Sequence, residues 1–248
     1  MNPIKIRAAS SADAVSMAGW VNQTGHAVDT DTQAEGERLY LAIDEGDRPV
    51  ACLRLREHLG LALPRYSYHV GQAVHAASEL GLFQRQATLL LGNDQTGDSE
   101  LTDIACAPGL DEALQQAALQ TLLDSALARI AGEPLRHGAR LIVELGGVRD
   151  AAGRSVFWQG LGAHFCPRDP AEAQVSMGEA WRSHLAALLP RQLLYLSFLD
   201  AAAQAAVGQA GVAAQPALKV LRASGFAPGR HVRIDDGGPI WELSLAAS

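Results

Sequence analysis

The sequence predicts a mixed fold of class α/β (α+β). The chain has 248 residues, of which 48% are apolar and 19% charged, so it can bury a sizeable core as one large or two small domains. Strand-like runs alternate with helix-like segments from the N-terminus onward. Residues 112–131 carry apolar side chains at the spacing of one helix face and lie between two strand-like runs.

The first part of the chain is expected to form a strand, a helix and a hairpin. Residues 4–8 are typical of a short strand, and the helix that follows is expected to be capped by Ser10 or Ser11. Two further strand-like runs surround residues 44–48, where a Glu-Gly-Asp triplet predicts a hairpin turn. These elements favour two neighbouring antiparallel strands.

The middle of the chain is expected to add short strands and the longest helix. Strands are expected at 66–70 and within the apolar run 87–91. After a polar turn, a further strand ends before Pro108 and leads into the helix at 112–131. A strand at 139–147, a turn, a short helix at 155–162 and a strand at 163–167 are expected next.

The pattern changes beyond Pro167. The expected elements are a helix at 179–189, a strand at 193–199, an Ala-rich helix capped by Asp200, a helix at 216–223 and a hairpin through 235–238. This change predicts two parts, a domain over residues 1–168 and an α/β subdomain over residues 169–248 packed on it.

Charge and cysteine content exclude several classes of function. The net charge is −7 and the Lys and Arg residues are scattered, which argues against a nucleic-acid or anionic-membrane surface. With no signal peptide and no apolar run of membrane-spanning length, the sequence predicts a cytoplasmic protein. The three cysteines, Cys52, Cys106 and Cys166, lie in or beside apolar runs and are expected to be reduced.

Four polar motifs punctuated by glycine stand out between the apolar runs. Because each buried polar group needs a partner, such stretches are costly as scaffold and are typical of a functional site. The motifs are YHVGQAVHAASELG (68–81), LGNDQTGDSEL (91–101), GRSVFWQGLGAHF (153–165) and DDGGP (235–239).

The order hairpin, strand, long helix, strand and short helix resembles the GNAT-type acyltransferase fold, a mixed, mostly antiparallel sheet flanked by helices. The four motifs, with LLP-x-x-LLY, VGQ and QPAL-x-VL-x-x-x-GF, occur in the same order as in arginine N-succinyltransferases, over residues 65–242. This family moves a succinyl group from succinyl-CoA to the α-amine of arginine. The resemblance implies the same kind of activity for this chain, with arginine or a related amino acid as acceptor and succinyl-CoA or another acyl-CoA as co-substrate.

The resemblance also places the acyl-CoA. In the GNAT fold the CoA pyrophosphate rests on backbone N–H groups of the turn that opens the long helix, which is 107–112 here. The cofactor-binding residues implied are Ile104, Cys106, Gly109 and Leu110. This turn departs from the family pattern, since it has one glycine, no Lys or Arg, and the acids Asp111 and Glu112.

Two functions therefore stay open. The chain is either an acyl-CoA-dependent N-acyltransferase, or a non-catalytic paralogue that acts as a partner subunit or an amino-acid-binding regulatory protein. An apolar, low-charge chain with a C-terminal subdomain also indicates a homo-oligomer, or a hetero-oligomer with a related subunit.

The catalytic candidates are Glu100 and His75. Glu100 begins the strand before the long helix, and His75 lies in a family motif; either could accept a proton from the substrate amine. Glu144 is a second carboxylate candidate because it lies inside an apolar run and must be paired or carry a raised pKa. The family commonly has Arg at position 146, where this chain has Gly, and GNAT enzymes often have a tyrosine acid where this chain has Trp158.

The substrate-binding candidates come from the same motifs. Arg154 could form a forked ion pair with a carboxylate of the amino acid or of the succinyl group. Ser155 could instead be only a helix cap, and the residues around Asn93 only a turn. The spacing of the histidines shows no metal site. The substrate-binding candidates are His69, Asn93, Asp94, Ser99, Arg154, Ser155 and His164.

Overall fold

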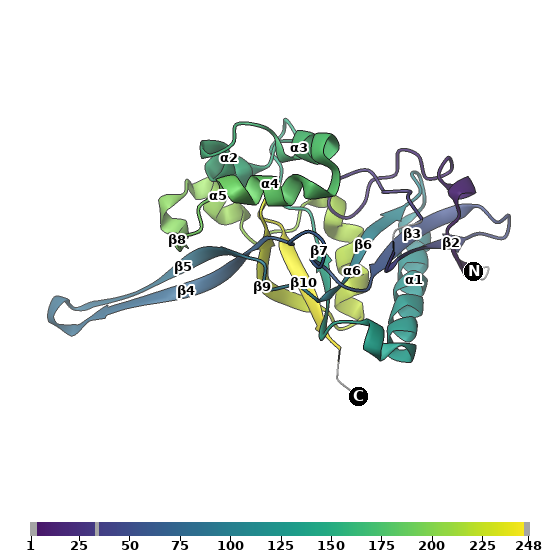
Figure 1. The fold of residues 1–248 in the computed structure, drawn as a ribbon, viewed down its shortest axis with the longest axis horizontal. Coiled ribbons are helices and arrows are strands. Elements are labelled where there is room, and N and C mark those ends of the chain that lie inside the picture. The colour runs from purple at the N-terminus through teal and green to yellow at the C-terminus, as the bar shows by residue number, and fades with distance from the viewer. Residues whose placement is uncertain (1–3, 33–34, 246–248) are drawn as a thin grey trace.

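The computed structural model describes residues 4–32 and 35–245, which fold around one mixed sheet (Figure 1). Within these residues the sheet has ten strands in the order β1-β2-β3-β6-β7-β10-β9-β4-β5-β8. The strands are β1 Lys5–Ala8, β2 Glu37–Ile43, β3 Pro49–Arg56, β4 Ser67–Ala77, β5 Leu82–Gly92, β6 Ser99–Cys106, β7 Arg140–Glu144, β8 Leu194–Tyr195, β9 Ala227–Arg233 and β10 Pro239–Ser244. The pairings are antiparallel apart from β6 with β7, so the predicted mixed, mostly antiparallel sheet is confirmed.

Helices flank this sheet, and two of them cover one face of it. As the apolar spacing predicts, α1 buries Leu119, Leu122 and Leu123 against the strands, together with side chains of α6. The second core contains Phe157, Trp158 and Trp181 and joins α2, α3, α4 and α5 to the sheet near β4 and β9. The helices are α1 Glu112–Gly132, α2 Val156–Gly160, α3 Pro170–Met177, α4 Trp181–Leu188, α5 Ala201–Ala206 and α6 Gln215–Ala223.

The two C-terminal strands lie in the middle of the sheet. The turn at 234–238 closes the predicted hairpin, and β10 pairs with β7 while β9 pairs with β4. Strands from both sides of the predicted boundary near residue 168 thus share hydrogen bonds in one sheet. The division at that residue stays a prediction.

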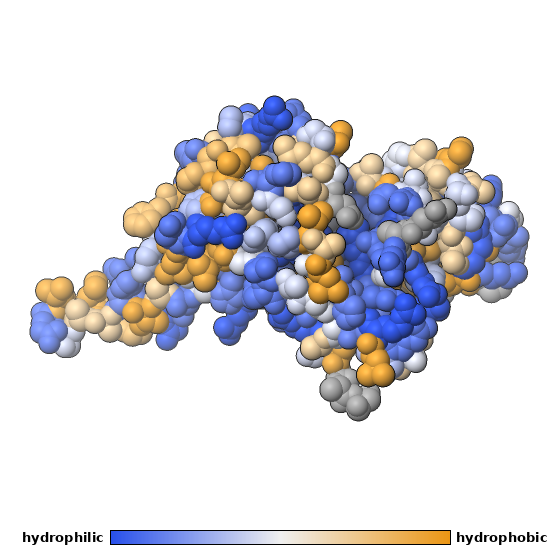
Figure 2. Space-filling model, in the orientation of Figure 1, coloured by the Kyte–Doolittle hydropathy of each residue, from blue (hydrophilic) through white to orange (hydrophobic). Residues whose placement is uncertain are grey.

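The motif at 68–81 forms much of a long hairpin. The sequence predicted strands only at 66–70 and 87–91, whereas β4 and β5 pair along their whole length, from Ser67 opposite Gly92 to Ala77 opposite Leu82. Beyond the pairings with β9 and β8, residues 72–87 project from the body as a two-stranded ribbon (Figure 1), which we call the arm. Figure 2 shows apolar side chains along it, and Val74, Leu80 and Phe83 are exposed.

Three predicted elements near the chain's turns were wrong. The N-terminal helix is only a 3-10 turn at Ser11–Asp13, although Ser10 caps it as predicted and the Asp13 carboxylate accepts from the Ser10 N–H and from Arg7. The strand at 163–167 is a 3-10 turn at Gly162–His164, where the ring of Trp158 packs on the glycine. The strand at 193–199 shortens to Leu194–Tyr195.

Candidate active site

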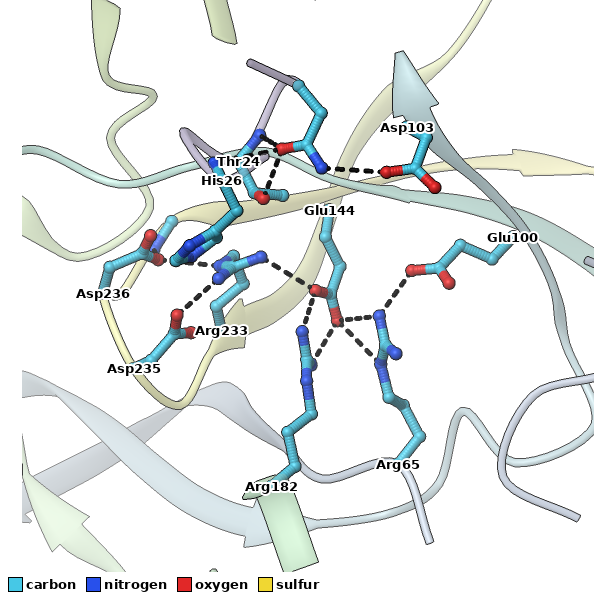
Figure 3. A network of polar contacts seen from close by, with 12 residues as sticks. Thr24, His26, Arg65, Glu100, Asp103, Glu144, Arg182, Arg233, Asp235 and Asp236 are labelled. Atoms are coloured by element: carbon cyan, nitrogen blue, oxygen red, sulfur yellow. Dashed lines mark hydrogen bonds and ion pairs between the residues drawn. The ribbon is translucent and has the colours of Figure 1, made fainter. Parts of the chain in front are cut away.

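A pocket of about 850 Å³ opens beside β6 and β7. Its wall comes from the N-terminal segment around Asn22 and His26, the loop 57–65, the bulged part of β6, the end of β7, and α4. Much of its lining is charged, and the arginines and carboxylates there face one another (Figure 3). The charged side chains at the centre of this network are Arg65, Arg182, Arg233 and Glu144.

Glu144, at the end of β7, is the centre of this network. It is 1% exposed, and its carboxylate accepts hydrogen bonds from Arg182 (2.6 Å to Oε1), Arg65 (3.1 Å) and Arg233 (3.1 Å). Burial alone would raise the pKa of Glu144, but the guanidiniums of Arg182, Arg65 and Arg233 outweigh burial and hold it well below its ordinary value. Glu144 is therefore a fixed anion that orients three guanidiniums.

The DDGGP motif orients one of these guanidiniums. Arg233 ends β9, and its Nε donates to Asp236 Oδ1 at 2.9 Å while Nη2 donates to Asp235. Asp236 Oδ1 also accepts from the backbone N–H of Gly238 at 2.9 Å, so the tight turn and the ion pair support each other. Burial and the neighbouring Asp235 raise the pKa of Asp236 despite Arg233. The motif therefore acts on the pocket through Arg233.

Glu100 lies in the same network. Arg65 joins it to Glu144, with Nη2 at 2.5 Å from Glu100 Oε1 and at 3.0 Å from Glu144 Oε1. The other oxygen of Glu100 accepts from Arg56 at 3.3 Å. Both oxygens of this 1% exposed carboxylate are thus engaged by guanidiniums. Its predicted role as the catalytic base stays a prediction, and its visible role is to hold Arg65.

A bulge in β6 brings a further carboxylate toward the pocket. Asp103 has φ +48°, in the left-handed region, at the point where the pairing of β3 with β6 shifts register. Its carboxylate accepts from Arg54 Nε at 2.8 Å and from the Asn22 side chain at 3.0 Å. The bulge therefore ties the N-terminal segment to the edge of β6.

His26 is a pocket residue that the sequence analysis missed. Burial, and then the nearby Arg233, lower the pKa of His26 to about 4, so the ring is neutral at pH 7. Within the described residues its buried Nε2 has no hydrogen-bond partner. Figure 3 shows the ring beside Arg233. In the neutral tautomer with its proton on Nδ1, the Nε2 of His26 can accept a hydrogen bond from a substrate amine.

His26 should make the protein sensitive to mild acid. Since its folded pKa lies below the ordinary value of 6.5, the unfolded state binds the proton first, and stability falls as pH drops from about 6.5 toward 4. We expect wild type to lose about 2 kcal/mol more than His26→Gln between pH 7 and pH 5. Urea unfolding at the two pH values measures the difference, and equal losses would contradict the placement of a neutral, half-buried His26.

Comparison with known proteins identifies the family. A family model described as arginine N-succinyltransferase beta subunit matches residues 8–247. The chain belongs to the arginine N-succinyltransferase family. The subunit beta of that enzyme from Pseudomonas aeruginosa is 34% identical over 212 residues, covering 85% of this chain and 61% of the relative. The arginine N-succinyltransferase of Enterobacter sp. (strain 638) is 36% identical over 188 residues, covering 75% of this chain and 54% of the relative.

The likeness extends to a solved structure. Arginine/ornithine succinyltransferase subunit AI from Pseudomonas aeruginosa superposes with a TM-score of 0.75 at 22% identity, covering 98% of this chain and 77% of that one. At that identity the likeness shows a shared fold. The chain spans 61% of the length of the Pseudomonas aeruginosa subunit beta and 54% of the length of the Enterobacter enzyme.

Several substrate-binding candidates from the succinyltransferase motifs gather away from the pocket. Asp94 Oδ2 lies 2.8 Å from His231 Nε2, and the His231 ring packs against His69 with centroids 5.3 Å apart. Asn93 begins the exposed turn in which its carbonyl accepts from Thr96. Ser99 is buried and donates to the carbonyl of Glu57 at 2.5 Å. These contacts fit a structural role for the NDQTGDSEL motif and a small His-Asp cluster beside β4 and β9.

The catalytic candidate His75 and the remaining substrate-binding candidates are dispersed. His75 lies on the arm, where its ring packs on Tyr195. Arg154 is exposed and pairs with Asp150 at 2.9 Å, and Ser155 caps α2 by accepting from Trp158 N at 3.0 Å. His164 is exposed in its 3-10 turn. The structure does not bring these four together with Glu100, and their proposed roles stay predictions.

The cofactor candidates lie along one line, from β6 into the turn before α1. The N–H of Ile104 donates to Gln23, and Cys106 ends β6 with its thiol pKa raised to about 12 by burial. Gly109 has φ +81° in the turn, and the carbonyl of Leu110 accepts from Gln115. The N–H of Ile104 is already used by Gln23, and the cofactor-binding role of these four residues stays a prediction.

The described ranges, 4–32 and 35–245, contain no group of three His, Cys, Asp or Glu side chains placed to hold a metal ion. Their helices include none that combines the length and apolar character needed to cross a bilayer.

Proposed function

We propose that this chain is a subunit of an N-acyltransferase that moves a succinyl or other acyl group from acyl-CoA to the α-amine of arginine or a related amino acid. The observation that carries the proposal is the pocket in which Glu144 fixes the guanidiniums of Arg65, Arg182 and Arg233 beside β6. Family membership and the names of the relatives support it.

The pocket offers the groups that an amino acid requires. Oriented guanidiniums form forked pairs with carboxylates, which suits the α-carboxylate of the acceptor or the free carboxylate of a succinyl group. Asp29, exposed at the pocket wall, and Glu35 offer negative charge toward a basic side chain. Asp235 and the buried Glu144 keep the site from being uniformly positive.

The proposed reaction uses His26 to hold the amine. The amine loses its extra proton to solvent, its neutral nitrogen attacks the thioester carbon, and the carbon–sulfur bond breaks; the proton released from nitrogen passes to His26 Nε2, and the leaving CoA thiolate takes up a proton from solvent. A substrate carboxylate bound beside Arg233 would offset part of that guanidinium's influence and raise the pKa of His26 toward neutrality.

A binding titration followed by an assay tests this function. Succinyl-CoA, acetyl-CoA and free CoA are titrated calorimetrically into the whole chain, and thiol release is then followed with arginine, ornithine and lysine. We expect binding of an acyl-CoA, amine-dependent thiol release, and turnover lowered by a factor of about 10² or more in His26→Gln. Absence of binding by all three CoA species, in wild type and in variants, would refute the acyltransferase function.

One observation favours the second candidate, a non-catalytic subunit. Asp111 caps α1, with Oδ1 accepting from Leu114 N at 2.8 Å, and so places a carboxylate where a pyrophosphate would bind. Lys219 of α6 pairs with the neighbouring Glu112 and offsets only that charge. A chain that binds arginine calorimetrically and no CoA species would fit this alternative.

We also propose that the arm binds a second chain of the same family. A two-stranded hairpin without further cover is marginally stable in water, and apolar Val74, Leu80 and Phe83 are exposed along it.

The partner tested is another copy of this chain. We expect light scattering after size exclusion to give a dimer mass for wild type and a monomer mass for Phe83→Asp. Leu135→Asp, at a residue 98% exposed near the end of α1, is the matched control and should stay dimeric. A wild-type monomer would leave only a related subunit as the partner.

A further inference from the structure

Strands β6 and β7 leave a gap between them. They pair only at their first residues, Ser99 opposite Leu141 and Glu100 opposite Ile142. Farther along, β6 stays paired with β3 on its other edge, and β7 stays paired with β10. The two facing edges therefore separate toward the turn before α1, and their backbone groups need partners from elsewhere.

Gln23 supplies those partners for both strands. Its side-chain Oε1 accepts from the N–H of Ile104 on β6 at 2.9 Å, and its backbone carbonyl accepts from the N–H of Gly146, just past β7, at 2.9 Å. The residue is 1% exposed. Among the described residues its buried Nε2 has no hydrogen-bond partner, so the amide is held by its oxygen alone.

The turn that carries Gln23 fits the gap closely. The N–H of Asn22 donates to the carbonyl of His26 at 2.8 Å, and Gly25 takes φ +83° to close the turn. The Asn22 side chain bonds to Asp103 on the bulge. A Cβ on Gly146 would lie 2.8 Å from the carbonyl oxygen of Thr24, so β7 has no room for a side chain here. The absence of the family's arginine at 146 thus has a physical reason, because the turn occupies its space.

The groups that Gln23 satisfies are those that an acyl-CoA arm would use. The pantetheine arm of CoA carries two amides and ends in a thioester carbonyl, which accepts hydrogen bonds as an amide carbonyl does. A CoA held at the turn 107–111 would extend its arm toward the pocket along the free edge of β6. The N–H of Ile104 points into that path, and the amide oxygen of Gln23 already occupies it.

We propose that Gln23 is an internal stand-in for the acyl donor, and that acyl-CoA binds only when the side chain of Gln23 leaves the gap between β6 and β7, while the turn at residues 22–26 keeps His26 in the pocket. The inference rests on the proposed function, since it takes acyl-CoA as the ligand of this gap. Opening breaks the hydrogen bond between Gln23 Oε1 and the N–H of Ile104, so part of the donor's binding free energy is used to displace this side chain. Gln23 thereby sets the affinity for the donor.

The test compares donor affinity in variants that remove the Gln23 side chain or loosen its anchoring. Succinyl-CoA is titrated into wild type, Gln23→Ala and Asn22→Ala, with Val15→Ala as the control, since Val15 is 85% exposed outside the gap. We expect Kd to fall at least ten-fold in Gln23→Ala, to fall in the same direction in Asn22→Ala, and to be unchanged in Val15→Ala. Asn22→Ala carries the test alone if Gln23→Ala does not fold.

Hydrogen exchange separates the two ways of failing. In wild type, saturating succinyl-CoA should not slow exchange over residues 20–28, because Gln23 loses its bond to β6 while the turn stays in place. Equal Kd in wild type and variants, or protection of 20–28 on binding, would overturn the role of Gln23 while leaving the acyltransferase function standing. If exchange shows that Gln23→Ala is folded and it still binds no succinyl-CoA or acetyl-CoA, the proposed function itself is refuted, and with it the assignment of acyl-CoA to the gap.

Discussion

Replacing Glu144 by glutamine is expected to lower the free energy of unfolding by about 3–5 kcal/mol, because it leaves buried guanidiniums without their shared anion. Arg182, Arg65 and Arg233 all donate to this carboxylate, and Glu144 and Arg233 are each at most 2% exposed. The amide of a glutamine at position 144 carries no charge. Its N–H groups would also point at the N–H groups of the surrounding guanidiniums. Urea unfolding at pH 7 measures the loss.

The matched control is Glu79→Gln, which removes the same charge from an exposed residue at the tip of the arm. That change should alter the free energy of unfolding by less than about 0.5 kcal/mol. The pH dependence of the free energy of unfolding gives a second test of the role of Glu144. Because the folded pKa of Glu144 is depressed, its contribution is complete at neutral pH and is lost as pH falls below the ordinary carboxyl range. A Glu144→Gln protein as stable as wild type at pH 7 would contradict the network.

Replacing Gly147 by alanine is the second change expected to have a large effect, about 3 kcal/mol of lost stability. A Cβ at this position would lie 2.1 Å from the carbonyl oxygen of Asp236 and 2.9 Å from the backbone nitrogen of Gly238. Both atoms are backbone atoms of the DDGGP turn, so the turn itself must move. Since Asp236 holds Arg233, we expect the pocket to loosen as well.

Gly132→Ala is the control for that substitution. Gly132 ends α1, and a Cβ there would meet no described atom within 4 Å. Alanine should therefore be neutral or raise stability by up to about 1 kcal/mol, through its better helix propensity. Thermal unfolding of the two variants beside wild type gives the comparison. Similar midpoints for both would show that the DDGGP turn does not pack on Gly147 as described.

Local patterns were enough to predict the elements that depend on local interactions. The helix α1 follows from its apolar spacing, and Asp111 caps it as a helix-starting acid should. The hairpin of β2 and β3 follows from its turn residues. The arm was missed because most side chains of residues 72–87 are exposed on both faces, so the strands lack the alternation that marks a half-buried strand.

The site was only partly predictable because its contacts join distant parts of the chain. Glu144 stood out as a carboxylate in an apolar run that needed a partner. Its partners lie 79, 38 and 89 residues away, at Arg65, Arg182 and Arg233, and nothing in the local sequence marks Arg65 or Arg182. The one available signal was the Arg that precedes the two acids of DDGGP. Gln23 had no signal at all, because its importance comes from the divergence of two strands far along the chain.

The central position of β9 and β10 also bears on how this protein is made. On the ribosome, β7 and the β4–β5 hairpin emerge long before the strands that join them, since β10 pairs with β7 and β9 with β4. Both edges therefore stay open until residues up to 244 have been synthesised. Nascent chains with unpaired sheet edges are prone to aggregate. During translation this chain should depend on chaperones that shield those edges, and release from them should coincide with insertion of the C-terminal hairpin.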